Sequence, residues 1–210
     1  MNIITNHYEA EHWKKNHLVA GVDEAGRGCL AGPVVAASVI FRMDFNDNNG
    51  INDSKKLTPE KRLELEDYII KHALAYSVSF VCNETIDRIN ILVATMNAML
   101  DAVNNLLVKP DFLLIDGNRY TGEGIPYRTI VGGDAKCLSI AAASILAKVA
   151  RDRWMSDVAG ERYPQYGFAK HKGYGTKAHV EKILKYGPCE IHRKTFLKKL
   201  YARQDCMFSE

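Results

Sequence analysis

The chain has 210 residues, 47% of them hydrophobic and 25% charged, with a formal net charge of +3. These values are ordinary for a globular protein, and they exclude intrinsically disordered and collagen-like chains. The longest uncharged apolar stretch covers residues 28–41 and contains a proline, so the sequence predicts no membrane-spanning segment.

The first third of the chain alternates short apolar runs with polar turns. Residues 18–23 and 33–41 are apolar, and both are predicted to be buried strands. The polar stretch 42–57 is predicted to be a loop. Thr58-Pro59-Glu60 then combines a capping residue, a proline at the first helical position and an acid in the first turn. A helix is therefore expected from there to about His72.

The middle of the chain carries strand and helix periodicities in turn. Residues 74–82 alternate large apolar side chains with alanine and serine, which is the period of a strand. Residues 84–106 place apolar side chains three and four positions apart, which predicts one long amphipathic helix. Residues 111–116 and 127–131 are predicted strands that run into glycines, and the alanine-rich stretch 138–155 is a predicted helix. This order of elements favours an α/β fold with a mixed sheet flanked by helices.

The C-terminal quarter differs from the rest of the chain in its charge. Residues 162–203 contain eleven Lys and Arg but two acids, a net charge of +9, whereas the remaining residues carry −6. The same segment holds seven of the nineteen aromatic residues, among loops and short helices that include one starting at Thr176. Basic residues interleaved with aromatic ones suit a polyanion, although a solvated helical face over core aromatics explains them equally well. We divide one compact domain into a core, residues 1–160, and a basic helical C-terminal extension or cap, residues 161–210.

The cysteines and the N-terminus bear on cellular location. The five cysteines are widely spaced and include no Cys-x-x-Cys pair: Cys29, Cys82, Cys137, Cys189 and Cys206. This pattern is typical of free thiols in a reducing compartment rather than of disulfides or a zinc site. The first residues lack the apolar segment and the cleavage site of a secretory signal. We therefore expect a cytoplasmic protein, and nothing indicates more than a monomer.

Four acidic residues share one placement in the predicted fold. Asp23, Glu24, Asp116 and Asp134 each lie where an apolar strand runs into glycine. Acids at several strand ends can converge on one ligand site, and clustered carboxylates are tolerated where a cation offsets their charge. Oxygen ligands alone favour Mg²⁺ or Mn²⁺, and two such ions about 4 Å apart would hold a phosphodiester and activate a water. The alternative is that these acids are turn formers or helix caps.

Two local features limit this set of acids. Neighbouring side chains on a strand face opposite sides of a sheet, so Asp23 and Glu24 can both bind a metal only if the strand bends or ends between them. Asp152 is a further candidate, but its position between Arg151 and Arg153 favours a salt bridge on a helix surface.

Three further segments carry candidate substrate contacts. Gly26-Arg27-Gly28 is too short for a phosphate-binding loop motif, but its glycines allow close backbone approach and its arginine can fork onto a phosphate or ribose oxygen. A plain turn explains it equally well. Lys55 lies in a polar loop, where it could bind phosphate or remain solvated. Tyr174 lies between two glycines and has little to pack against, so it is a candidate for stacking on a sugar or base.

These residues lie in motifs that match a known family. The segments GVDEAGRGCLAGPVVAA, DSKKLTPEKR, NILVATMNAM, LLIDGN, GGDAKCLSIAAASILAKVARD and YPQYGFAKHKGYGT resemble bacterial ribonuclease HII, in that order. The resemblance extends from about Val19 to Phe196. It implies a ribonuclease H-like fold with a C-terminal helical extension. It also implies metal-dependent cleavage of the RNA strand of RNA/DNA hybrids and cleavage 5′ of single ribonucleotides in duplex DNA, leaving a 3′-hydroxyl and a 5′-phosphate.

The resemblance assigns metal ligands to four residues. Asp23 and Glu24 match the family's Asp-Glu pair, Asp116 matches the Asp of its Ile-Asp-Gly strand, and Asp134 matches its fourth acid. The implied cofactor is Mn²⁺ or Mg²⁺.

The resemblance also assigns substrate contacts. Gly26, Arg27 and Gly28 match the Gly-Arg-Gly element associated with sensing the ribose 2′-hydroxyl, the group that distinguishes RNA from DNA. Tyr174 matches the tyrosine that contacts the sugar at the RNA–DNA junction. The implied partners are RNA/DNA hybrids and ribonucleotide-containing duplex DNA.

The chain departs from the family pattern at two cysteines. Cys29 and Cys137 stand where proline or another small residue is expected, close to the catalytic acids. Neither is a proposed ligand, and we expect small buried side chains there.

Two alternatives are weighed against this prediction. Ribonuclease HIII carries an extra N-terminal domain and lacks the Arg between these glycines, whereas here Arg27 is present and only about 18 residues precede the first strand. That family is therefore not expected. A non-catalytic nucleic-acid-binding protein would use the basic extension alone, and it would cleave nothing with Mn²⁺ or Mg²⁺.

Overall fold

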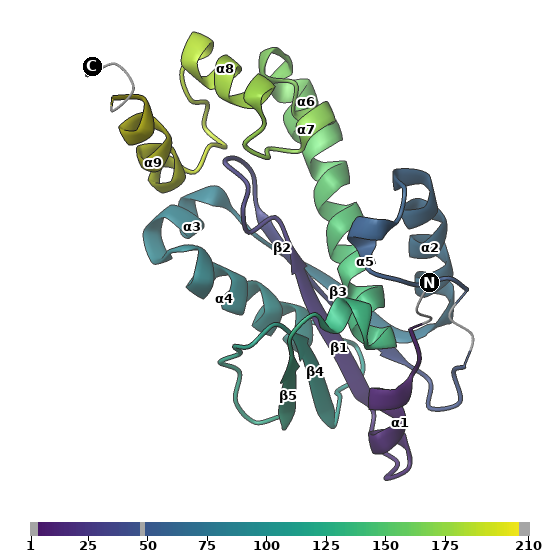
Figure 1. Ribbon diagram of the computed structural model, residues 1–210. Helices are drawn as coiled ribbons and strands as arrows, with labels where there is room; N and C mark the ends of the chain where they lie inside the picture. The colour runs from purple at the N-terminus through teal and green to yellow at the C-terminus, as the bar shows by residue number, and fades with distance from the viewer. Residues whose placement is uncertain (1–3, 47–48, 206–210) are drawn as a thin grey trace.

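The computed structural model describes residues 4–46 and 49–205, so the last five residues of the predicted extension, Cys206 among them, lie outside the described part. A five-stranded sheet with the strand order β3-β2-β1-β4-β5 forms its centre, and helices cover both faces (Figure 1). The strands are β1 (Val19–Ala25), β2 (Val34–Phe41), β3 (Ala73–Val81), β4 (Phe112–Asp116) and β5 (Tyr127–Ile130). The longer helices are α2 (Pro59–His72), α4 (Ile91–Asn104), α5 (Leu138–Arg153), α8 (Lys177–Tyr186) and α9 (Lys194–Asp205).

Shorter helical elements connect these. They are α1 (His7–Trp13), α3 (Asn83–Ile89), α6 (Ala159–Arg162), α7 (Phe168–His171), the 3-10 turns η1 (Ser54–Lys56), η2 (Gly133–Ala135) and η4 (Pro164–Tyr166), and the π-helical turn η3 (Trp154–Val158). The five predicted strands are confirmed, and so is the α/β mixed sheet flanked by helices.

The sheet combines both strand orientations. β2 pairs antiparallel with β1 and β3, whereas β4 pairs parallel with β1 and β5. Val22 of β1 lies opposite Ile115 of β4, so the next residues are Asp23, two positions before the end of β1, and Asp116, the last residue of β4. The register therefore brings two of the candidate acids to the same edge of the sheet.

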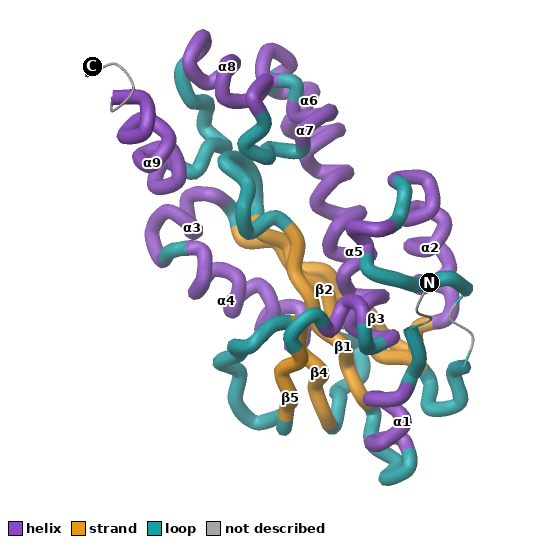
Figure 2. The backbone as a smooth tube through the Cα atoms, in the orientation of Figure 1, coloured by secondary structure: helices purple, strands orange, loops and turns teal. Residues whose placement is uncertain are grey.

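The core lies on both faces of the sheet. All eight residues of β2 are buried, because α4 covers one face and α5 with α2 covers the other (Figure 2). α5 lies closest to the sheet at Gly21, where a Cβ atom would overlap the backbone of Ser139. The small residues of α5 and this glycine therefore let the helix pack directly on β1, beside the strand end that carries Asp23.

The prediction of one long helix over residues 84–106 was wrong. The segment forms α3 and α4, and the break falls at Asn90, whose φ is +67°. Asparagine tolerates this left-handed conformation, and its side chain caps α4 by accepting hydrogen bonds from the backbone N–H groups of Leu92 (3.0 Å) and Val93 (3.2 Å). The apolar periodicity continues through the break, so it did not indicate it.

The helix predicted over residues 138–155 begins at Leu138 as expected but runs further. α5 continues through the π-helical turn into α6 and ends at Arg162, shortly before Pro164. In Figure 1 this helical run leads from the sheet to α7 and α8, across the boundary expected at residue 160.

The C-terminal extension is attached to the loop between β1 and β2. Ala31 and His192 form an isolated antiparallel bridge, the N–H of Gly32 donates to the carbonyl of Ile191 (2.8 Å), and the N–H of Arg193 donates to that of Leu30 (2.9 Å). These backbone hydrogen bonds fix the extension beside the carboxyl end of β1. In the part of the chain that the structure describes, no helix is both long and apolar enough to cross a membrane.

Candidate active site

Three carboxylates meet at the carboxyl ends of β1 and β4. One oxygen each of Asp23, Glu24 and Asp116 lies within 4.8 Å of the others. Asp23 is only 4% exposed, and the other two are half-buried. β1 does not end between Asp23 and Glu24 but continues to Ala25. The Oδ1 of Asp23 accepts a hydrogen bond from the backbone N–H of the next residue, Glu24 (2.7 Å).

The electrostatics of this cluster favour a bound cation. Burial raises the pKa of Asp23 well above its ordinary value, and the charges of Glu24 and Asp116 raise it further. Burial also raises the pKa of Glu24, although the Arg27 guanidinium, 3.2 Å from Glu24 Oε1, opposes this. A divalent cation would offset the repulsion, and a donor set of carboxylate oxygens fits Mg²⁺ or Mn²⁺.

The fourth predicted acid lies beside the cluster rather than in it. Asp134, in η2, is buried, and its Oδ2 accepts a hydrogen bond from Lys55 Nζ (2.9 Å). This hydrogen bond raises the pKa of Lys55. η2 is also tied to the cluster, because the N–H of Gly133 donates to Asp116 Oδ1 (2.6 Å). The structure therefore brings Asp134 and Lys55 together as an ion pair next to the three acids.

A cavity of about 210 Å³ opens over these groups. Its lining includes the three clustered acids and the predicted substrate contacts Gly26, Arg27, Lys55 and Tyr174. A larger, mainly apolar groove of about 550 Å³ lies between α3, α8 and α9, and the one acid in its lining, Asp87, caps α9. The smaller cavity therefore holds the clustered acids and four of the predicted substrate contacts.

Gly26 and Arg27 line this cavity, whereas the third residue of the predicted element, Gly28, does not. Gly26 has φ +95°, and a Cβ atom there would overlap the guanidinium of Arg151. Nothing lies within 4 Å of the corresponding position at Gly28, so the backbone there is open to close approach. The carbonyl of Arg27 accepts a hydrogen bond from Arg193 Nη1 (2.9 Å), which joins this loop to the C-terminal extension.

Tyr174 faces the same cavity from the extension. The residue is 40% exposed, in agreement with the expectation that it is not a core residue. Lys148 Nζ lies 5.2 Å from the centre of its ring, and the Arg151 guanidinium carbon lies 5.7 Å from it. Both cations lie within cation–π distance of the ring.

Sequence reasoning missed two cavity residues on α5, Ser144 and Lys148. Ser144 hydrogen-bonds the carboxylate of Asp23 and the hydroxyl of Ser54 (2.9 Å). Ser144, Lys148 and Asp152 follow one another at intervals of four residues, so they share one face of the helix. This four-residue spacing, in a helix that starts beside the strand-end acids, was the signal in the sequence that could have identified Ser144 and Lys148.

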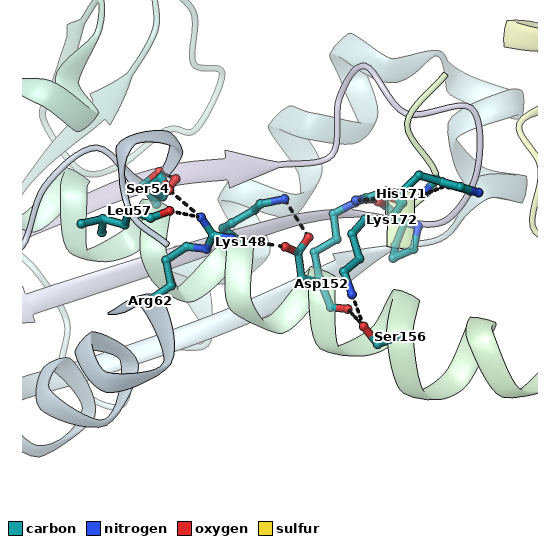
Figure 3. Close-up of polar contacts among 12 residues, drawn as sticks. Ser54, Leu57, Arg62, Lys148, Asp152, Ser156, His171 and Lys172 are labelled. Atoms are coloured by element: carbon teal, nitrogen blue, oxygen red, sulfur yellow. Dashed lines mark hydrogen bonds and ion pairs between the residues drawn. The ribbon is translucent and has the colours of Figure 1, made fainter. Parts of the chain in front are cut away.

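Asp152 makes the salt bridges that its sequence position favoured. Its Oδ1 accepts a hydrogen bond from Lys148 Nζ (2.8 Å), and its Oδ2 lies 4.0 Å from Arg62 Nη2 (Figure 3). Arg62 in turn donates to the carbonyls of Ser54 (2.9 Å) and Leu57 (2.7 Å). These hydrogen bonds and ion pairs connect the segment that carries Lys55 to Lys148, the lysine beside the Tyr174 ring.

The two cysteines expected near the catalytic acids, Cys29 and Cys137, are small buried side chains. Cys29 and Cys137 are both 0% exposed, and burial raises the pKa of each thiol. Cys29, Cys82, Cys137 and Cys189 are free thiols, in agreement with the sequence analysis.

Comparisons with known proteins identify relatives over nearly the whole chain. A family model described as ribonuclease HII matches residues 20–203. The ribonuclease HII of Caldicellulosiruptor bescii is 52% identical over 199 residues, which cover 93% of this chain and 95% of that protein. The ribonuclease HII of Chlorobium luteolum is 56% identical over 189 residues, 88% of this chain and 90% of the relative. The crystal structure of ribonuclease H2 from Pyrococcus horikoshii is similar with a TM-score of 0.72 at 28% identity, covering 89% of this chain and 98% of that one.

Proposed function

Because the chain belongs to the ribonuclease HII family, we propose that it cuts ribonucleotide-containing duplex DNA and RNA/DNA hybrids at the cluster of Asp23, Glu24 and Asp116. The family is that of the metal-dependent type 2 ribonuclease H endonucleases, and the chain is such an enzyme. The observation that supports the assignment to these residues is the convergence of their carboxylate oxygens within 4.8 Å. A non-catalytic binding protein is not favoured, since relatives 52% and 56% identical are ribonucleases.

The three clustered acids hold the metal in this proposal. Bound Mg²⁺ or Mn²⁺ ions, two in the scheme adopted here, would activate a water and stabilise the leaving 3′-oxygen. Asp23, Glu24 and Asp116 bind and orient the ions through oxygens on two adjacent strand ends. Asp134 supplies the fourth carboxylate of the proposed site. Its partner Lys55 contacts a phosphate of the substrate, and the ion pair between Lys55 and Asp134 rearranges when the substrate binds. The products carry a 3′-hydroxyl and a 5′-phosphate.

Recognition of the ribonucleotide is assigned to the two loops that flank the acids. Arg27, together with the backbone of Gly26 and the open backbone at Gly28, reads the ribose 2′-hydroxyl. Tyr174 stacks on the sugar at the junction between RNA and DNA. The basic extension, with a net charge of +9 over residues 162–203, binds the phosphate backbone of the duplex.

The remaining expectations concern the molecule in the cell. The four free cysteines support a location in a reducing compartment, and we propose the cytoplasm. We also propose that the enzyme acts as a monomer, because every group assigned to the site comes from a single chain.

Incubation of an end-labelled DNA duplex that contains one ribonucleotide, with Mn²⁺, Mg²⁺ or EDTA, tests this function. We expect a cut on the 5′ side of the ribonucleotide with either ion, a 3′-hydroxyl on the upstream product, and no cut with EDTA. An all-DNA duplex of the same sequence is the control. Absence of cleavage with every divalent ion would refute the proposal.

A further inference from the structure

Two buried histidines in the C-terminal extension face each other behind Tyr174. His179 of α8 is 0% exposed, and His192, just before α9, is 1% exposed. Their Nε2 atoms lie 3.1 Å apart. Neither residue lines the catalytic cavity, and neither has a part in the proposed chemistry.

The partners of these rings determine where each proton resides. His192 Nδ1 lies 2.9 Å from the backbone N of Cys189, 3.1 Å from its Sγ and 3.3 Å from its carbonyl oxygen. The backbone N–H can only donate and makes the shortest of these contacts, so we assign Nδ1 as the acceptor and place the proton of His192 on Nε2. That proton is donated to His179 Nε2, which leaves the proton of His179 on Nδ1. His179 Nδ1 lies 2.9 Å from the carbonyl oxygen of Tyr174 and therefore donates to it. Burial lowers the pKa of both rings to about 4, so both are neutral at pH 7, as this chain of hydrogen bonds requires.

The backbone around Tyr174 depends on partners from outside its own loop. Lys172 and Gly173 have φ values of +52° and +80°, and the left-handed conformation is unfavourable for lysine. The carbonyls of three consecutive residues each accept a hydrogen bond from outside the loop, and the carbonyl of Tyr174 accepts a second one from the N–H of Thr176 (2.8 Å) within it. Lys172 accepts from Arg151 Nη1 (2.9 Å), Gly173 from the N–H of Leu30 (2.8 Å), and Tyr174 from His179 Nδ1 (2.9 Å).

These contacts fix the Tyr174 backbone against α5, the loop after β1, and α8. Arg151 and Leu30 belong to the core, whereas His179 is the contribution of the basic extension. The extension therefore holds Tyr174 in place as well as supplying it.

We propose that His179, kept in a single tautomer by His192, is a positioning residue that sets the place of the Tyr174 ring over the cavity. The inference rests on the proposed function, in which this ring contacts the sugar at the RNA–DNA junction. It adds a residue that acts on junction recognition through Tyr174 without touching substrate.

A matched pair of variants separates this role from general support of the fold. His179→Asn keeps an amide N–H near the position of Nδ1 and so retains a donor for Tyr174, whereas His179→Gln keeps a polar group near Nε2 and loses that donor. Each loses one of the two hydrogen bonds, so their melting temperatures should fall by similar amounts. We expect His179→Gln to lower kcat/KM on a duplex with one ribonucleotide by about tenfold, and His179→Asn by about twofold. Equal losses in the two variants would overturn the proposal.

A double mutant tests whether the effect passes through Tyr174. In a Tyr174→Ala background, His179→Gln should cause no further loss of kcat/KM on the one-ribonucleotide duplex, and a full additional tenfold loss would contradict the proposal. His7→Gln, which changes an exposed histidine of α1, is the control and should leave kcat/KM unchanged. If the wild-type protein cuts no duplex, the proposed function fails. If it cuts but the variants at His179 lose activity equally, only this inference fails.

The wild-type protein gives a test that is independent of how the variants fold. ¹⁵N NMR at pH 7 should find the proton of His179 on Nδ1 and that of His192 on Nε2. The opposite tautomer at His179 would leave the Tyr174 carbonyl with the N–H of Thr176 but no donor from α8, and would overturn the proposal.

Discussion

Asp23 illustrates how the surroundings of one side chain select its chemistry. A carboxylate that is 4% exposed, beside two further carboxylates, destabilises the folded protein when it is charged. The chain offsets the neighbouring acids with local cations, Arg27 at Glu24 and Lys55 at Asp134. The charge that remains on Asp23 and Asp116 is the charge that a metal ion would neutralise.

In the proposed function Arg27 would link metal binding to substrate recognition, because it pairs with Glu24 while half of its side chain is exposed. We expect Arg27→Ala to reduce cleavage of a one-ribonucleotide duplex about tenfold and cleavage of a continuous RNA/DNA hybrid much less. Arg27→Lys, which keeps the charge but loses the fork of donors, should fall between wild type and Arg27→Ala. Steady-state kinetics on both substrates measure this ratio, and an equal loss on the two would contradict the proposed role.

The sequence revealed the residues whose signal is local. Asp23, Glu24 and Asp116 could be found because an acid between an apolar strand and a glycine is visible in the chain itself. The ion pair of Lys55 with Asp134, 79 residues apart, has no such signal. The same holds for His179 and His192, whose relation to Tyr174 exists only after α8 has packed against the loop.

At the scale of the elements, strands were easier to predict than helix boundaries. Each strand is a short apolar run that ends at a turn, and all five were predicted. The break at Asn90 escaped because both helices, α3 and α4, bury the same face against the sheet, so the apolar spacing persists across it. The run from α5 to α6 exceeded its predicted end because Trp154–Val158 continues as a π-helical turn.

The contact of α5 with β1 at Gly21 sets the position of both Asp23 and Ser144. Gly21→Ala would place a Cβ atom on the backbone of Ser139, so we expect the free energy of unfolding to fall by about 3 kcal/mol. Chemical denaturation measures this change. Gly160→Ala is the matched control, because a Cβ atom there would meet its nearest neighbour, Ala169, at an ordinary 3.5 Å. A Gly21→Ala protein as stable as wild type would show that the helix does not lie where the structure places it.

At the scale of the whole molecule, the net charge of +3 conceals an acidic core and a basic extension. The sequence indicated this division but not how the parts are joined. The structure joins them at the loop between β1 and β2, where Arg193 donates to the carbonyl of Arg27, and within the extension His179 lies in hydrogen-bond contact with the carbonyl of Tyr174. Both proposed recognition loops therefore depend on the extension, so its role extends beyond attraction of the duplex.

The acid cluster predicts how stability depends on pH and metal. The pKa of Asp23 is higher in the folded than in the unfolded chain, so the folded state holds more protons between these two values. The free energy of unfolding of the metal-free protein therefore falls as the pH rises through that range. Mn²⁺ at about 100 times its Kd should add about 2.7 kcal/mol at pH 8, and less at pH 5 where protons compete. Thermal unfolding with Mn²⁺ or EDTA measures this, and an equal effect of Mn²⁺ at both pH values would contradict it.

The most direct test of the account compares wild type with Asp116→Asn on one labelled duplex that contains a single ribonucleotide, in the presence of Mn²⁺. The substitution removes a clustered carboxylate and leaves the basic extension unchanged. We expect cleavage to fall by at least about 10³-fold while the Kd for the duplex, measured in EDTA, changes less than about threefold. Cleavage by Asp116→Asn at the wild-type rate would show that the three acids are not the catalytic centre.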